Sequence, residues 1–125
     1  MPQRILVVDD DILVVQALHE LLTASGYEVT MATRGQDALD LLNQEHFDLL
    51  ILDVVMPKMT RFDVCMEVRK RDDENNKVKI IMLSAKDEPT DFSVAEKYGC
   101  VLYLTKPLDP GRLKELVAEA LEVRS

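Results

Sequence analysis

Short, continuous runs of aliphatic residues recur along the chain and predict the strands of a buried sheet. Four consecutive apolar residues lead directly into Asp53, and similar runs lie in three other places. An aliphatic run without alternation is typical of a strand covered on both faces, as in a parallel sheet. Residues 27–32 alternate more, which favours a less buried edge strand. The predicted strands are residues 4–8, 27–32, 49–52, 79–83 and 101–104.

Between these runs, apolar residues recur at the spacing of a helix face. The first helix is expected to begin after Asp11, a suitable N-cap, and to end at Gly26. Its inward positions are Val14, Leu18, Leu21 and Leu22. The other predicted helices are residues 35–45, 61–71, 89–98 and 110–123, with a polar loop at 72–77. Their expected core residues include Ala38, Leu39, Leu42, Phe62, Cys65, Val68, Leu113, Leu116, Val117, Ala120 and Leu121.

Strands and helices therefore alternate five times, which predicts an α/β fold. Such (βα)5 alternation implies a parallel sheet with helices on both faces and right-handed crossovers. The expected architecture is a flavodoxin-like, doubly wound open sheet of five strands in the order 2-1-3-4-5. A length of 125 residues fits one domain, so residues 1–125 are predicted to fold as a unit.

The formal net charge of −8 limits the classes of partner. It disfavours direct binding to nucleic acid or to an anionic membrane surface, and suits a metal cation or a basic protein patch. Cys65 and Cys100 lack metal-binding spacing and are expected to be reduced core thiols. With no signal peptide or apolar run of membrane-spanning length, the expected location is the cytoplasm. His19 and His46 are expected to have no role in chemistry, and the methionines are expected to fill the core.

Polar residues follow four of the predicted strands and form the candidate site. They are Asp9 and Asp10, Asp53, Ser84 and Lys106. Parallel strands end at one edge of the sheet, so these side chains are expected to converge. Clustered carboxylates repel one another unless a cation lies among them, and Mg²⁺ suits oxygen ligands of this kind. Asp53 could then attack a phosphoryl group and form an acyl phosphate. Each residue alone also has an ordinary interpretation, as a turn, a helix cap or a surface side chain.

Four short motifs together resemble the receiver domains of bacterial two-component response regulators. They are Val7-Val8-Asp9-Asp10, Leu52-Asp53-Val54-Val55-Met56-Pro57, Met82-Leu83-Ser84-Ala85 and Thr105-Lys106-Pro107. The resemblance covers essentially the whole chain, and its strength lies in the order of the motifs, because each occurs alone by chance.

The resemblance implies a role for each matching position. Asp53 is similar to the phosphoacceptor, Lys106 to the family's lysine, and Ser84 to the switch hydroxyl. Tyr103 matches the aromatic switch position. The implied ligands of Mg²⁺ (or Mn²⁺) are Asp10, Asp53 and the backbone carbonyl of Val55, with Asp9 acting mostly through water.

The family also implies partners. A sensor histidine kinase or a histidine phosphotransfer protein would supply the phosphoryl group, and a downstream protein would read the fourth helix, fifth strand and fifth helix. The chain would be a signalling domain rather than a conventional enzyme, either a monomer or a phosphorylation-dependent dimer. It departs from the pattern at Thr60 and Arg61, where the family usually has an acidic or small residue and then glycine.

Other functions remain open on the sequence alone. A flavin binder would need a loop rich in Ser, Thr or Gly after the first strand, where this chain has three aspartates. A phosphatase with an aspartyl intermediate would need a second acid where Val55 stands. A degenerate receiver that only docks a partner, and a receiver cut from a longer regulator, are further alternatives.

Overall fold

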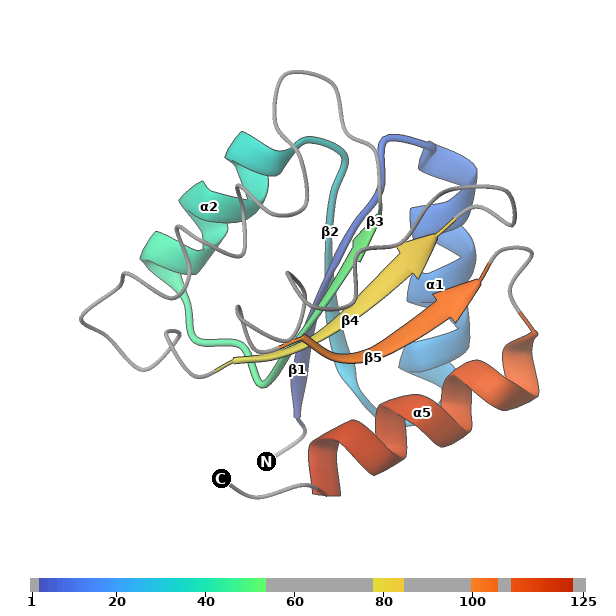
Figure 1. The fold of residues 1–125 in the computed structure, drawn as a ribbon. Helices are drawn as coiled ribbons and strands as arrows, with labels where there is room; N and C mark the ends of the chain where they lie inside the picture. Colours follow the sequence, from blue (N-terminus) through green and yellow to red (C-terminus); the bar gives the residue numbers. More distant parts are fainter. Residues whose placement is uncertain (1–2, 54–77, 85–99, 106–108, 123–125) are drawn as a thin grey trace.

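The core of the protein is one parallel β-sheet. A computed structural model describes residues 3–53, 78–84, 100–105 and 109–122, with the backbone alone at Asp53, Ser84, Glu122 and residues 100–105. The strands are β1 (Arg4–Val8), β2 (Glu28–Ala32), β3 (Leu49–Asp53), β4 (Lys79–Ser84) and β5 (Cys100–Thr105). They lie in the order β2-β1-β3-β4-β5, and every adjacent pair is parallel (Figure 1). The α/β class and the parallel sheet are therefore as expected, and β2 is an edge strand.

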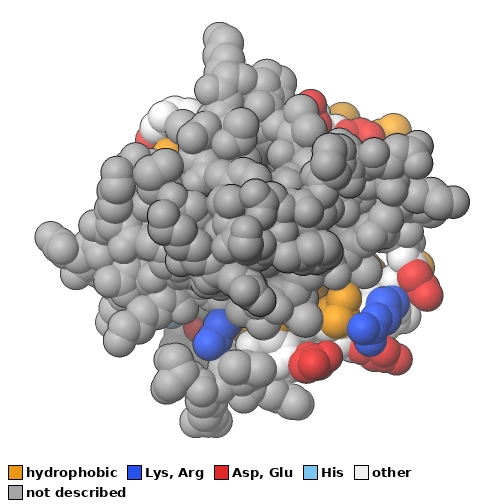
Figure 2. Space-filling model, in the orientation of Figure 1, with side chains coloured by type: hydrophobic (Ala, Val, Ile, Leu, Met, Phe, Trp, Pro, Cys, Tyr) orange, Lys and Arg blue, Asp and Glu red, His pale blue; other side chains and the backbone are white. Residues whose placement is uncertain are grey.

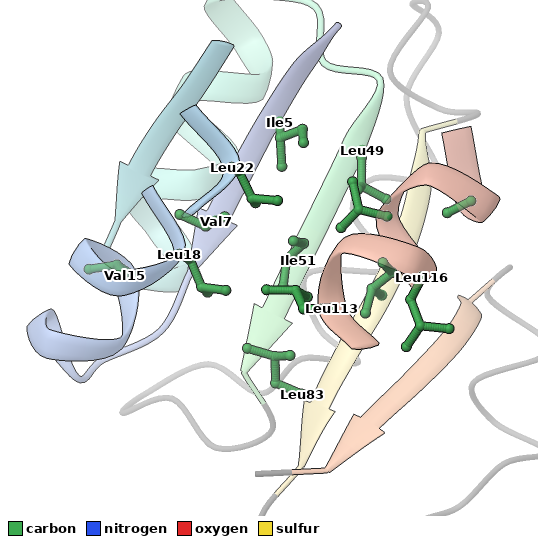
Figure 3. Packing of buried hydrophobic residues seen from close by; sticks show 13 residues of the cluster. Ile5, Val7, Val15, Leu18, Leu22, Leu49, Ile51, Leu83, Leu113 and Leu116 are labelled. Carbon is green, nitrogen blue, oxygen red and sulfur yellow. The ribbon is translucent and has the colours of Figure 1, made fainter. Parts of the chain in front are cut away.

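Alternate residues of the central strands enter two separate hydrophobic clusters. Leu6, Val8, Leu50 and Leu52 pack with Ala38, Leu39 and Leu42 of α2 (Gly35–Gln44). Ile5, Val7, Leu49 and Ile51 pack on the opposite face, against α1 (Ile12–Ala24) and α5 (Pro110–Glu122) (Figure 3). Because successive side chains of a strand point to opposite faces, an unbroken aliphatic run supplies both clusters at once.

Helix α1 begins and ends where local sequence signals predict. Asp11 is its N-cap, and the Asp11 side chain accepts a hydrogen bond from the backbone N–H of Leu13. Gly26 follows the helix with φ of 99°, a conformation that favours glycine. Leu18 and Leu22 are fully buried as expected, and so is Val15, which the spacing argument did not include. Val14 and Leu21 are only partly buried.

The other two described helices also match their predicted faces. Helix α2 buries Ala38, Leu39 and Leu42. Helix α5 buries Leu113, Leu116, Val117 and Ala120, and Leu121 packs partly buried against the same cluster. In Figure 2, acidic and basic side chains lie together over α5, which is the charged exterior expected of an amphipathic helix.

Arg4 connects several segments at the amino-terminal edge of the sheet. Its guanidinium pairs with Glu28 and Glu45, donates to the carbonyl oxygen of His46 at 3.0 Å, and lies 5.0 Å from the ring centre of Phe47. The backbone N–H of Arg4 also donates to the Asp48 carboxylate at 2.9 Å. This network joins β1, β2 and the segment that leads into β3 at the end of the sheet opposite the candidate site.

One expectation about the methionines is wrong. Met82 is fully buried, but Met31 on β2 is 41% exposed, because the carboxyl end of an edge strand is only partly covered. The predicted helices at 61–71 and 89–98, the loop at 72–77 and Cys65 lie outside the described residues, so those predictions stand as made. None of the helices that the structure describes is long and apolar enough to cross a membrane.

Candidate functional site

The register of β1 and β3 places two of the predicted acids side by side. Val8 pairs with Leu52, and each is followed directly by an aspartate, Asp9 in one strand and Asp53 in the other. Neighbouring strands lie about 4.8 Å apart, so the backbones of Asp9 and Asp53 come together where the two strands end. Residues 44 positions apart in the sequence thus meet at one edge.

The register extends this edge to β4 and β5. Asp53 pairs with Leu83, Leu83 pairs with Leu104, and Ser84 pairs with Thr105. Asp53, Leu83 and Leu104 thus form one row of paired residues across the three strands, and Ser84 lies one residue beyond this row. Tyr103 pairs with Met82, one row inside it.

The pairing of Ser84 with Thr105 was not anticipated from the sequence. A register shift in the β4–β5 pair decides it, since Ile80 pairs with Cys100 but Ile81 pairs with Leu102. The sequence of β5 is that of an ordinary strand and contains no local signal for this irregularity.

Asp9 is held firmly at the end of β1. It is fully buried, and its Oδ1 accepts a hydrogen bond from the backbone N–H of Asp11 at 2.9 Å. The backbone N–H of Asp9 donates to the carbonyl oxygen of Ala32 at 3.2 Å, which joins the ends of β1 and β2. A buried carboxylate with fixed geometry is better suited to orienting a water molecule than to binding a metal ion directly.

The three consecutive aspartates occupy different environments. Asp9 is buried, whereas Asp10 and Asp11 are exposed. Asp11 serves as the N-cap of α1 through its bond to the Leu13 N–H at 2.9 Å. Asp10 lies between them in the sequence, directly after the end of β1, and is exposed.

These environments fit a hydrated Mg²⁺ ion. Magnesium uses one or two carboxylates, keeps several waters and prefers hard oxygen ligands. An exposed Asp10 can provide a direct ligand, and a buried Asp9 can hold a water in place. Among the side chains that the structure describes, which exclude that of Asp53, no group of three or more His, Cys, Asp or Glu residues is arranged to hold a metal.

The remaining predicted site residues fall outside the described chain. Val55 and Lys106 lie there, as do Thr60 and Arg61 of the atypical loop. Lys106 directly follows Thr105, the last residue of β5. Its assigned role and that of Val55 stay predictions.

Comparison with known proteins gives the same family as the motifs. Residues 5–118 match the response regulator receiver domain family. The alkaline phosphatase synthesis transcriptional regulatory protein PhoP of Bacillus subtilis is 37% identical over 121 residues, covering 97% of this chain and 49% of that protein. The response regulator MprA of Mycolicibacterium vanbaalenii is 38% identical over 118 residues, covering 94% of this chain and 48% of that protein.

A solved structure extends the similarity to three dimensions. The chemotaxis response regulator CheY4 of Vibrio cholerae is 31% identical and aligns with a TM-score of 0.87, covering 96% of this chain and 99% of that one. The chain spans about half the length of the curated relatives it matches. On the match over residues 5–118, the chain belongs to the response regulator receiver domain family.

Proposed function

We propose that this receiver domain accepts a phosphoryl group on Asp53. The donor is a phosphohistidine of a sensor histidine kinase or of a histidine phosphotransfer protein. A carboxylate oxygen of Asp53 attacks phosphorus, the P–N bond breaks, and the imidazole leaves with the electron pair, so that Asp53 becomes an acyl phosphate. The single observation that supports this most is the register of β1 and β3, which ends with Asp53 beside the buried Asp9, the residue that the exposed Asp10 follows.

Several residues around Asp53 would together neutralise the negative charge of the phosphoryl group. Asp10, Asp53 and the carbonyl of Val55 would hold Mg²⁺ or Mn²⁺, with Asp9 orienting a water. The bound ion supplies neutralisation of charge on the phosphoryl oxygens. Lys106 would bind a second oxygen, and Ser84 would donate a hydrogen bond to a third.

The phosphoryl group would then act as a switch. It adds roughly −1.5 to −2 charge and strong acceptor oxygens, which favour the arrangement that brings Ser84 towards it. Tyr103 would change its position together with Ser84. In the complete (βα)5 fold that we propose, the surface of the fourth helix, β5 and α5 would present this change to a downstream protein.

The domain would transmit its phosphorylation state by contact with protein rather than by direct contact with nucleic acid. PhoP is named as a transcriptional regulator, and the present chain covers about half of it. We propose that this domain signals to a partner or to a further domain from the cytoplasm, either as a monomer or as a dimer that phosphorylation stabilises. It is a self-modifying signalling domain rather than an enzyme acting on a separate substrate.

Treatment with acetyl phosphate and Mg²⁺ tests the proposal. Intact-mass measurement should show the addition of one phosphoryl group, labile to hydroxylamine as an acyl phosphate is. The label should be absent from Asp53→Ala and should depend on Mg²⁺. Asp10→Asn should need much more Mg²⁺ for the same labelling.

A matched substitution away from the edge provides the control. Asp40→Asn removes an exposed carboxylate from α2 and should label like the original chain. Undiminished labelling of a folded Asp53→Ala protein would refute the assignment of the phosphoacceptor. A complete lack of labelling in the original chain, with either acetyl phosphate or a phosphorylated histidine phosphotransfer protein, would favour a docking module instead.

A further inference from the structure

A groove outside the phosphoacceptor site lies beside the edge strand β2. It is bounded by the start of α1, the end of β2 and helix α2, and has a volume of about 480 Å³. The residues that matter for its chemistry are Ile12, Met31 and Leu41, which are apolar, and Asp37, Asp40 and Gln44, which are polar. In Figure 1 the carboxyl end of β2 leads into α2 here.

The apolar part of this groove is unusually exposed. In the described part of the chain, the large exposed hydrophobic residues are Ile12, Leu13 and Met31, at 49%, 71% and 41%. Two of these three, Ile12 and Met31, line the groove although they lie on different elements. These two exposed apolar side chains from separate elements, with polar residues around them, form a small surface that an apolar side chain of a partner could cover.

The charged residues that line the groove are acidic, and one of them is paired with an arginine beside it. Asp37 and Asp40 line it, and among the residues that the structure describes no lysine or arginine does so. Asp37 is already paired with Arg34, with nitrogen–oxygen distances of 2.9 and 3.0 Å, so among the described residues Asp40 is the lining carboxylate that no cation pairs. Two more exposed acids, Asp10 and Asp11, immediately precede Ile12. In Figure 2, acidic and hydrophobic side chains lie together at the upper right, where α1 starts in Figure 1.

We propose that this groove docks a short basic, amphipathic segment of a partner protein. Large apolar side chains of that segment would cover Ile12, Met31 and Leu41, while its lysine or arginine side chains would face Asp40 and the exposed acids that precede Ile12. A second copy of this chain fits poorly, because both copies carry a net charge of −8.

The groove is separate from the surface proposed to read phosphorylation. β2 and β5 are the two outer strands of the sheet, so a segment bound beside β2 leaves the surface around β5 and α5 available. The groove is also connected to the acidic edge, since the Asp9 N–H donates to the carbonyl oxygen of Ala32 at 3.2 Å. The docking proposal does not depend on phosphorylation of Asp53.

Fluorescence anisotropy with three labelled peptides tests this inference. The first probe is a short peptide with leucine at helical spacing among lysines. The second replaces the lysines by glutamates, and the third replaces the leucines by serines. Only the first should bind appreciably at physiological salt, because each of the others lacks one of the two required features. Amide NMR shifts on binding should concentrate around Ile12, residues 31–33 and α2.

Two pairs of variants separate the groove from general attraction to an acidic protein. Met31→Ser should weaken binding of the first peptide about tenfold, whereas Leu13→Ser, which alters a more exposed leucine outside the lining, should change it less than about twofold. Asp40→Lys should weaken binding about fivefold, whereas Glu119→Lys, an equal charge change on the exposed face of α5, should have little effect.

The same measurements can overturn the proposal. Equal binding of the first and third peptides would show attraction to net charge alone. A loss with Leu13→Ser or Glu119→Lys as large as that with its groove counterpart would place the binding surface elsewhere. No measurable binding of the first peptide would also reject a basic amphipathic occupant.

Discussion

Asp9 and Asp11 make the same local hydrogen bond in different surroundings. Each Oδ1 accepts the backbone N–H two residues further along, from Asp11 and Leu13 respectively, at 2.9 Å. Asp9 is buried at the end of β1, whereas Asp11 is exposed and starts α1. Two successive side-chain turns therefore determine the path from strand to helix and leave Asp10 exposed between them.

Asp11→Ala should lower the free energy of unfolding by about 1 kcal/mol, because the Leu13 N–H loses its cap. Asp11→Asn should change it much less, since an amide oxygen can accept the same bond. Both variants remove the same negative charge, so their difference isolates capping from repulsion among the aspartates. Urea denaturation followed by circular dichroism measures it. Equal stabilities for the two variants would contradict a capping role for Asp11.

Two glycines at helix ends have opposite conformational requirements. Gly26 follows α1 at φ of 99°, with no heavy atom within 4 Å of where a Cβ would lie. Gly111 lies in the first turn of α5, and a Cβ there would meet the Asp109 Oδ1 at 3.6 Å, an ordinary contact. Space is available at both positions, so backbone conformation decides the effect of a side chain.

Gly26→Ala should destabilise the protein by about 1–2 kcal/mol, because the left-handed conformation is unfavourable for an L-residue with a Cβ. Gly111→Ala should be neutral or stabilising by up to about 1 kcal/mol, because alanine favours the helix. Thermal unfolding of the two variants under one buffer condition gives the comparison. A loss of stability in Gly111→Ala equal to that in Gly26→Ala would show that packing, rather than φ, controls both sites.

At the scale of the whole molecule, charge is distributed unequally between the two ends of the sheet. The carboxyl ends of the strands carry Asp9, Asp10 and Asp53, whereas at the amino-terminal end Arg4 pairs with Glu28 and Glu45. The acidic side chains at the amino-terminal end are thus paired within the chain, whereas those at the site edge would gain from the divalent cation proposed above. Binding of that cation to the folded state alone would stabilise the whole domain.

Mg²⁺ at ten times its dissociation constant should raise the free energy of unfolding by about 1.4 kcal/mol. Asp10→Asn should lose most of this increase at the same concentration, whereas Asp40→Asn should retain it. Sodium chloride at matched ionic strength accounts for screening of the net charge. Equal stabilisation by the two salts in the original chain would argue against a specific metal site, and removal of Mg²⁺ with EDTA should reverse a specific effect.

Local patterns account for the parts of the fold that the sequence predicted well. The aliphatic runs gave β1 and β3, Asp11 and Gly26 gave the limits of α1, and the apolar spacing gave the inner faces of α2 and α5. That the backbones of Asp9, Asp53 and Ser84 reach one edge of the sheet also followed once a parallel sheet was inferred. The roles of all the site residues, Asp9, Asp10, Asp53, Val55, Ser84, Tyr103 and Lys106, stay predictions that the experiments above address.

In the part of the chain that the structure describes, the amino-acid sequence by itself determined which segments become strands and helices, because periodicity, capping and glycine conformation act over a few residues. Only the tertiary structure decided the exact rows at the site edge, where the shift between Ile80 and Ile81 pairs Ser84 with Thr105. It likewise decided that Ile12 of α1 and Met31 of β2 share one groove with α2. Both features depend on contacts between distant segments, whose alignment is set by packing of the sheet and helices rather than by local preference.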